Sequence, residues 1–479
     1  MNRDVVLGVD SGTQSTKVLA VDLETGEVHG EGRASHSGAS TQHPSEWWTA
    51  LRTAVSAIDL RGLNVRGLAV AGQQHGCVLI DEAGDIVRPA PLWNNVDAAP
   101  DAERLNREAD FAREIGTRLV AAVTIAKLAQ IKRTTPADIT HSSAACLPHD
   151  WLNFRLTGNL ATDRGDASGS GWWSPVQGRD RRDLLALAIG EADAQRIRLP
   201  EVRDPEVAAG TLTSEAAREL GLPQGIVVGP GTGDNMGAAL GVGAATGEMV
   251  ISLGTSGTAF AVSDRATSDE TGEVCGFADA TGKFLPLACM LNCTRVVDAT
   301  AQAFGIERGT ALDGAANIEP GAGGLLLLPY FEGERTPNLP NVTGALTGIT
   351  AEKLTAELMI RAALDGVAAG LAYCVETLNR VGVNGSALNL VGGGSGHPAW
   401  QQAIADATGL PVIVRAGQEH AARGAAAQAA AVVRGEPVAD VAATRRPPVI
   451  AEINPRPEVR GAFRLSERRR LIQQMQSAS

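Results

Sequence analysis

Two glycine-threonine turns with strand-like flanks recur far apart in this chain. The first, DSGTQST at residues 10–16, lies between the extended patterns Val5–Val9 and Lys17–Asp22. The second, SLGTSGT at residues 252–258, begins inside the β-branched and aliphatic run Met249–Leu253. A strand-turn-strand unit that occurs twice predicts two related domains, each beginning with the same β-hairpin.

The chain length agrees with two domains. Its 479 residues exceed the size at which one hydrophobic core keeps growing. We place the boundary within the glycine-rich stretch 241–247, which gives an N-terminal domain of residues 1–243 and a C-terminal domain of residues 244–479. Short apolar strands alternate with longer Ala- and Leu-rich helical segments, which predicts an α/β fold. Examples are Gly67–Ala71 and Leu388–Val391 for strands and Leu354–Leu378 for a helix.

Charge and composition exclude several partners. With 42 Lys and Arg against 54 Asp and Glu, the formal net charge is -12, which opposes binding to nucleic acid. No run of about 18 uncharged apolar residues is present, so we expect a cytoplasmic protein without a membrane partner. The six cysteines are scattered without a CxxC pair and are expected to be reduced, buried thiols.

Both glycine-threonine turns are suited to binding phosphate. Successive backbone N–H groups in such a turn form a concave nest for phosphate oxygens, and hydroxyl groups add donors. Asp10 is placed to hold Mg²⁺ beside those phosphates, and Lys17 to offset their charge. One such turn alone is usually only a turn, but two of them favour a nucleotide site. The candidate residues are Gly12, Thr13, Gln14 and Lys17 in the first turn and Gly254, Thr255 and Ser256 in the second. A side chain added at Gly254 or Gly257 is expected to crowd a turn that requires positive φ.

A third glycine cluster, VGGGSG at residues 391–396, follows a predicted strand and precedes the helical pattern Pro398–Ala407. Gly393 and Gly394 allow a close approach of backbone to ligand, and with Ser395 they are candidates for nucleotide binding. The alternative is a flexible strand-to-helix turn.

The segment VGPGTGDNMGAALG at residues 228–241 presents Asp234 and Asn235 just before small helical residues. A helix N-terminus stabilises an ionised carboxylate, so we expect Asp234 to be charged at neutral pH and able to accept a proton. Phosphoryl transfer requires such a group beside the attacking hydroxyl. The alternative is that Asp234 only caps the helix.

Polar side chains also end two other apolar stretches. Gln74 and His75, in AGQQHG, offer amide and imidazole groups that suit recognition of sugar hydroxyls. Trp93 and Asn94 are candidates for the same site, although Trp93 could equally belong to the core. Other nucleotide motifs fail, because Lys17 follows Thr16 where a P-loop requires Gly, and Met236 stands where a dinucleotide fingerprint requires Gly.

In their order along the chain, DSGTQSTK, AGQQHG, GTGDNMGAALG, SLGTSG, LPYFEGERTP and VGGGSG resemble the motifs of the FGGY carbohydrate kinases, and the xylulokinases among them. The resemblance runs from about Val5 to about Ala430. It implies an actin-like fold, with two ribonuclease-H-like domains flanking a central cleft, and in-line phosphoryl transfer from ATP with Mg²⁺.

The resemblance also implies roles for individual residues. Asp234 would be the general base, and Gln74, His75 and Asn235 would contact the sugar. Thr13, Lys17, Thr255 and Ser256 would attend the phosphates, Asp10 would organise Mg²⁺, and Gly393, Gly394 and Ser395 would lie by the adenosine. Glu334 and Arg335 belong to a family signature for which interdomain packing is one role.

The sugar-side segments depart from the family. Xylulokinases read WNDxR, but this chain has Asn95 and Asp97 at the Asp and Arg positions. Gln74 replaces a Met, and the TAPK segment reads TIAK at residues 124–127. These departures predict an altered sugar preference with intact phosphate chemistry.

We therefore expect ATP-dependent phosphorylation of a ketopentose, with D-xylulose to D-xylulose 5-phosphate as the first candidate. Ribulose, another ketose or a pentitol is the alternative substrate. A sugar- and ATP-binding regulator that has lost turnover is a second alternative, and a filament or chaperone of the same fold a third. A homodimer is left open.

Overall fold

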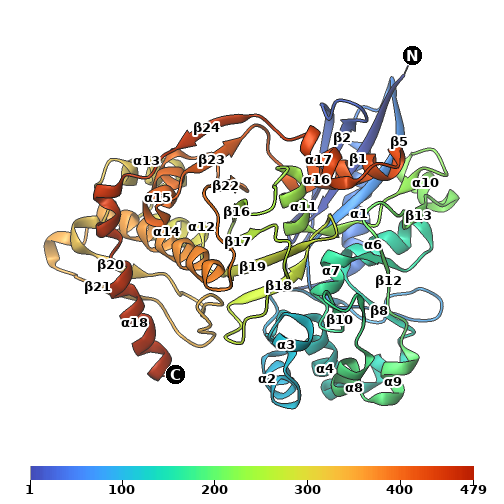
Figure 1. Ribbon diagram of the computed structural model, residues 1–479, viewed down its shortest axis with the longest axis horizontal. Coiled ribbons are helices and arrows are strands. Elements are labelled where there is room, and N and C mark those ends of the chain that lie inside the picture. Colours follow the sequence, from blue (N-terminus) through green and yellow to red (C-terminus); the bar gives the residue numbers. More distant parts are fainter. Residues whose placement is uncertain (1, 479) are drawn as a thin grey trace. The chain divides into compact units, whose positions relative to one another are not determined.

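The computed structural model describes residues 2–478 and divides the chain into two compact units (Figure 1). Unit 1 comprises Met1–Ala245, Ser263–Leu285 and Glu419–Pro447, and unit 2 comprises Thr246–Val262, Pro286–Gln418 and Pro448–Ser479. The chain thus leaves unit 1 close to the boundary expected between residues 243 and 244. It then returns to unit 1 twice, so neither unit is one continuous stretch.

Unit 1 is built on a seven-stranded sheet with the order β13-β14-β5-β1-β2-β3, to which β15 is added beside β5. Strand β1 pairs antiparallel with β2, as the first predicted hairpin requires, and parallel with β5. The bounds are β1 Arg3–Ser11, β2 Ser15–Asp22, β3 Val28–Ser35, β5 Leu63–Gly72, β13 Gly210–Thr211, β14 Val227–Val228 and β15 Thr232–Gly233.

The central strand β1 is buried on both faces, which explains its nearly continuous run of apolar residues. Helix α16 (His420–Arg434) packs directly on β1 and β5, visible beside these strands in Figure 1. Gly8 permits this approach, since a Cβ there would lie 2.0 Å from the Ala422 carbonyl oxygen. This packing is why the late segment Glu419–Pro447 belongs to unit 1.

The opposite face of the sheet packs on α1 (Pro44–Ser56) and α6 (Pro148–Thr157). Trp47 and Trp151 meet edge to face there, with ring centroids 6.1 Å apart. A second core of unit 1 is formed by further helices of the same unit. These include α2 (Ala99–Glu108), α3 (Phe111–Ile115), α4 (Thr124–Thr134), α8 (Arg182–Ile189) and α9 (Glu191–Arg196).

Three short elements of unit 1 carry or support polar residues described below. Strand β9 (Ala161–Asp163) leads directly into helix α7 (Arg164–Ser168). Helix α11 (Asp234–Gly241) follows β15 and packs against α16. A Cβ on Gly424 would lie 1.9 Å from the Gly237 carbonyl oxygen, so the two helices touch through glycine.

The main sheet strands of unit 2 are six members of a seven-stranded sheet and follow the order β19-β17-β16-β22-β23-β24. Strand β16 pairs antiparallel with β17, which confirms the second predicted hairpin, and parallel with β22. The bounds are β16 Met249–Leu253, β17 Gly257–Ala261, β19 Phe284–Met290, β22 Leu388–Val391, β23 Val412–Arg415 and β24 Val449–Ile453.

Helix α14 (Ala356–Arg380) is the main core helix of unit 2 and packs against α12 (Thr294–Ala303) and α15 (Pro398–Thr408). Thr355 caps its N-terminus by accepting a hydrogen bond from the Leu358 N–H. The helix is long and apolar enough to cross a membrane, but 83% of its most apolar window is buried in the protein. This burial is typical of a core helix.

The α/β class is confirmed in both units. All six cysteines are buried and unbridged.

Candidate active site

The turn between β1 and β2 brings Asp10 and Lys17 face to face. The two residues are cross-strand partners, and the Lys17 ammonium lies 3.8 Å from the Asp10 carboxylate. Lys17 also forms an ion pair with Glu419, which directly precedes α16. Burial raises the pKa of Asp10 to about 6, and Glu419 raises it further while Lys17 opposes the shift. Arg33 also lowers the pKa of Asp10, so two cationic side chains act on this carboxylate. A carboxylate oxygen is a ligand that Mg²⁺ prefers, so Asp10 suits a cation site.

Asp234 lies at the end of a buried strand beside β5. Strand β15 pairs parallel with β5 through Thr232↔Ala71 and Gly233↔Gly72. The segments that follow the two strands therefore leave the sheet at the same edge. Ligands of α/β proteins commonly bind at the carboxyl ends of such strands. Gly233 takes the N-cap position of α11 and Asp234 takes the first helical position. Asp234 is therefore not the N-cap residue, which weakens the alternative that it serves only as a cap.

The charge state of Asp234 differs from the expectation. Burial raises its pKa to about 7, and the nearby carboxylates of Asp10 and Asp166 raise it further. Hydrogen bonds from Asn235 lower the pKa but do not offset these effects. We expected the helix N-terminus to keep Asp234 charged at neutral pH, but desolvation and like charges outweigh the helix, so the carboxylate is only partly ionised there. A carboxylate with this pKa is well matched to proton transfer near pH 7.

Asn235 links the two polar loops. Its side-chain amide donates to the Asp234 carboxylate at 2.8 Å and to the side-chain oxygen of Gln74 at 3.1 Å. Gln74 is buried, and its amide nitrogen makes no hydrogen bond within the described residues. Three of the predicted sugar-site residues are thus brought together. The free amide donor of Gln74 is available for a ligand hydroxyl.

His75 is held in one orientation. Its backbone adopts φ 65°, a left-handed conformation that is unusual for a non-glycine residue. Its Nδ1 lies 2.8 Å from the Gly169 carbonyl oxygen, and its ring centroid lies 5.4 Å from that of Phe277. The Thr124 hydroxyl donates to the His75 carbonyl at 3.2 Å. Such strain in a buried polar residue is typical of a binding site.

Trp93 connects the substrate-side loop to the phosphate turn. Its indole N–H donates to the Thr13 hydroxyl at 2.8 Å. Asn94 and Asp97 are exposed, and the Asn95 amide donates to the Asp97 carboxylate at 3.1 Å. Two polar side chains of this loop therefore hydrogen-bond to each other. In the phosphate turn itself, Gly12 and Thr13 are half-buried and Gln14 is exposed.

In unit 2, the second and third glycine clusters lie together. The Gly394 N–H donates to the Leu253 carbonyl at 3.0 Å, directly beside the turn that holds Gly254, Thr255 and Ser256. Thr255 is exposed, and the Ser395 hydroxyl donates to the Gly392 carbonyl at 2.7 Å. These candidate nucleotide residues are thus brought together within unit 2.

Neither Gly254 nor Gly257 has a positive φ, so this expectation was wrong. The neighbouring third glycine cluster does contain such a residue, Gly392, with φ 88°. A Cβ on Gly392 would lie 2.7 Å from the Leu253 carbonyl oxygen. A side chain at Gly257 would be crowded by the Cys293 sulfur, which would lie 3.1 Å from an added Cβ.

Glu334 of the family signature makes contacts within unit 2. Its carboxylate accepts hydrogen bonds from the Asn292 side chain at 3.0 Å and from the Arg335 N–H at 2.8 Å. These contacts hold a turn of unit 2 in place.

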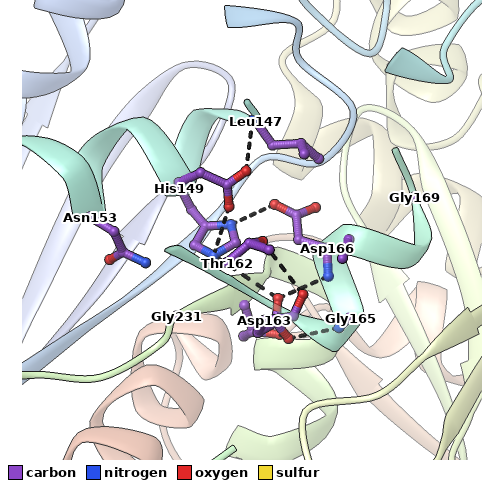
Figure 2. Close-up of polar contacts among 12 residues, drawn as sticks. Leu147, His149, Asn153, Thr162, Asp163, Gly165, Asp166, Gly169 and Gly231 are labelled. Atoms are coloured by element: carbon purple, nitrogen blue, oxygen red, sulfur yellow. Dashed lines mark hydrogen bonds and ion pairs between the residues drawn. The ribbon is translucent and has the colours of Figure 1, made fainter. Parts of the chain in front are cut away.

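A buried charged cluster that was not predicted from the sequence lies next to the Asp234 loop and is shown in Figure 2. His149 Nδ1 lies 2.6 Å from an oxygen of Asp166, and the Thr232 hydroxyl donates to Asp163 at 2.9 Å. The signal in the sequence was the charged residues within the short segments PHD and TDRGD, which flank otherwise apolar elements. The members of the cluster are His149, Asp150, Asp163 and Asp166.

Comparison with known proteins agrees with this geometry. Residues 5–241 match the model of the FGGY family of carbohydrate kinases, N-terminal domain, and residues 249–433 match the C-terminal domain of the same family. The chain is 43% identical to a xylulose kinase of Streptomyces coelicolor over 91% of this chain and 90% of the relative. It is 42% identical to a xylulose kinase of Streptomyces rubiginosus, with the same coverage of 91% and 90%.

A solved structure supports the same assignment. The crystal structure of a xylulose kinase from Bifidobacterium adolescentis superposes with a TM-score of 0.83 at 35% identity, covering 97% of this chain and 99% of that one. The two family matches together span most of the sequence. This chain therefore belongs to the FGGY family of carbohydrate kinases.

Proposed function

We propose that this carbohydrate kinase transfers the γ-phosphoryl group of ATP to D-xylulose, giving D-xylulose 5-phosphate and ADP. The observation that carries the proposal is the placement of Asp234. It lies at the carboxyl end of β15, hydrogen-bonded through Asn235 to the sugar-loop residue Gln74 and electrostatically coupled to Asp10 of the phosphate turn. The names of the relatives at 42% and 43% identity support D-xylulose as the sugar.

Asp234 is the general base in this proposal. Its carboxylate takes the proton of the C5 hydroxyl as that oxygen attacks the γ-phosphorus in line. The bond between the γ-phosphorus and the bridging oxygen breaks, and ADP leaves with the electron pair. Because burial raises the pKa of Asp234 to about 7, the group is a stronger base than an ordinary aspartate and is still partly ionised near neutral pH.

The sugar is oriented by the residues around Asp234. The free amide donor of Gln74 and the fixed ring of His75 provide hydrogen-bonding groups at set angles, as recognition of hydroxyls requires. The hydrogen bond from Trp93 to Thr13 joins this side of the site to the turn that receives phosphate. Asn94 completes the proposed set on the substrate side.

The phosphates and the cation are assigned to the three glycine clusters and to Asp10. Lys17 and the backbone N–H groups near Gly12, Thr13 and Gln14 would contact the phosphates. In unit 2, Gly254, Thr255 and Ser256 would take the same role, with Gly393, Gly394 and Ser395 beside the adenosine. Asp10 would hold Mg²⁺, and the bound ion would neutralise negative charge on the phosphates. The Asp10 carboxylate is the kind of oxygen ligand that Mg²⁺ prefers, and with a pKa of about 6 it is largely ionised at neutral pH.

A coupled ADP assay tests the proposal. ATP consumption is measured with D-xylulose, D-ribulose, L-ribulose and common pentitols, and the phosphorylated product is identified by mass spectrometry. We expect sugar-dependent turnover with the highest kcat/KM for D-xylulose. ATP hydrolysis that is independent of every sugar, or binding of sugar and ATP without turnover, would contradict it. The use of a small sugar and ATP also supports a cytoplasmic location.

A further inference from the structure

The buried cluster next to the Asp234 loop is built around a charged histidine. The side chains of His149, Asp150 and Asp166 are fully buried. Although burial alone would lower the pKa of His149, the carboxylates of Asp150, Asp166 and Asp163 raise it to about 10. These acids favour the imidazolium form of the ring, in which both nitrogens are donors.

Both donors of this ring have acceptors in place. Nδ1 donates to Asp166 at 2.6 Å, and Nε2 lies 3.3 Å from both the Pro230 carbonyl oxygen and Asp150. The contacts with Asp166 and with the Pro230 carbonyl are hydrogen bonds, and Asp150 lies beside Nε2 as an ion-pair partner. This arrangement suits a protonated His149 that partly neutralises the carboxylates of Asp150, Asp163 and Asp166.

His149 lies between the ends of the two strands that carry the polar loops. A Cβ on Gly72, which ends β5 just before the sugar loop, would lie 2.7 Å from the His149 Cβ. A Cβ on Gly231 would lie 2.5 Å from the His149 Cδ2. Gly231 has φ 80° and stands three residues before Asp234. The histidine is thus in contact with both loops.

Helix α7 makes a second connection between the same loops. At its N-terminus, Asp163 accepts hydrogen bonds from the Gly165 N–H and from the Thr232 hydroxyl, both at 2.9 Å. At its C-terminal end, the Gly169 carbonyl lies 2.8 Å from His75 Nδ1. Between these points, Asp166 binds His149. One short helix therefore contacts the approach to Asp234 and the sugar-loop histidine.

We propose that His149 and Thr232 are positioning residues that fix Asp234 relative to His75 by anchoring the 230–234 segment to helix α7. The proposal rests on the role of Asp234 as general base. A positioning group acts on the reaction step more than on substrate binding, and a displacement of about 1 Å can cost a hundredfold in rate.

The first test removes the Thr232 hydroxyl in one variant and retains a hydroxyl in a second. Thr232→Val keeps the shape but removes the donor to Asp163, and Thr232→Ser restores the donor. We expect Thr232→Val to lower kcat about tenfold to a hundredfold with an unchanged KM for ATP, and Thr232→Ser to recover most of it. Each rate is divided by the concentration of ATP-binding sites. A variant with a smaller folded fraction then does not show a false loss of kcat. A kcat for Thr232→Val equal to that of the parent would overturn the proposal.

The second test removes the charge with His149→Gln. The matched control is Asp101→Asn, which breaks another ion pair with a buried carboxylate in unit 1, with Arg133. We expect a loss of kcat in His149→Gln and parent-like kcat in Asp101→Asn, even where both lower the Tm. Equal kcat values in the two variants would reduce the cluster to a structural role. If His149→Gln does not fold, the Thr232 pair decides.

The general-base role of Asp234 and the positioning role of His149 and Thr232 can be tested separately. Turnover retained in Asp234→Asn contradicts the general base and with it the positioning role. Loss of turnover in Asp234→Asn together with normal kcat in Thr232→Val contradicts only the positioning role.

Discussion

The side-chain amide of Asn235 donates a hydrogen bond to the carboxylate of Asp234 at 2.8 Å. The amide thereby stabilises the ionised form of a carboxylate whose burial, together with Asp10 and Asp166, favours the protonated form. The balance between these effects sets the pH at which the base becomes available.

We predict that kcat/KM for the sugar rises with pH through about 7 and levels off above, because the base must be ionised. Asn235→Ala removes a donor that lowers the pKa of Asp234, so the rise should move to higher pH. The measurement is kcat/KM from about pH 5 to about pH 9 in both proteins. A profile that is flat across neutral pH, or a rise that moves to lower pH in the variant, would count against this.

Asp234→Asn is expected to increase thermal stability at alkaline pH. Burial and the neighbouring carboxylates raise the pKa of Asp234 from its ordinary 3.8 to about 7 in the folded protein. As the pH rises from about 4 to about 7, the unfolded chain releases this proton first, so the folded state loses stability, and the full cost is present above about pH 7. Since Asp234 is half-buried, solvent reduces the effect, and we expect an apparent Tm higher by roughly 2–6 °C near pH 8.5. The difference should vanish below about pH 4, where the carboxyl is protonated in both the folded and the unfolded state. A variant less stable than the parent at pH 8.5 would contradict the pKa shift.

Gly392→Ala should weaken ATP binding. Gly392 has φ 88°, and a Cβ would lie 2.7 Å from the Leu253 carbonyl beside the second phosphate turn. The matched control is Gly396→Ala in the same loop, where no atom lies within 4 Å of an added Cβ and φ is not positive. Titration calorimetry with ATP compares the three proteins. Equal affinities in folded Gly392→Ala and in the parent would contradict the assignment of this cluster to the nucleotide.

The substrate-side loop is predicted to shift the sugar preference. Asp97 offers only acceptors at the position where the WNDxR pattern of the resemblance implies an Arg, which would supply several donors. An unpaired polar group costs about 1–3 kcal/mol, enough to change relative efficiencies by roughly tenfold to a hundredfold. We expect the double variant Asn95→Asp, Asp97→Arg to change the relative kcat/KM values of the pentuloses, and Val96→Thr, in the same exposed turn, not to do so. The same order of sugars in the parent and the double variant would argue that the loop does not contact substrate.

The elements that carry glycine turns were predictable from the sequence. Met249–Leu253 and Leu388–Val391 form strands with the predicted bounds, and the helix predicted at Leu354–Leu378 is observed at Ala356–Arg380. These segments have a strong apolar pattern and clear turn residues at their ends, so local chemistry determines them. The packing of α16 on β1 was not predictable, because it depends on contact between Gly8 and Ala422, more than 400 positions apart in sequence.

The site was predictable in its residues but not in its electrostatics. Gln74, Asn235 and Asp234 were identified from motifs, and the structure brings them into hydrogen-bonding contact. The pKa of Asp234 depends on Asp10 and Asp166, whose proximity only the folded chain creates. The His149 cluster was missed for the same reason, since its acids come from separate elements.

The most direct test of the central claim is turnover of Asp234→Asn with ATP and D-xylulose. The coupled ADP assay gives the rate, and titration calorimetry gives ATP affinity. Loss of a general base typically costs about a hundredfold to ten-thousandfold in rate. We predict a loss in that range, with ATP affinity close to that of the parent. Sugar-dependent turnover within a few-fold of the parent would contradict the assignment of Asp234 as the base.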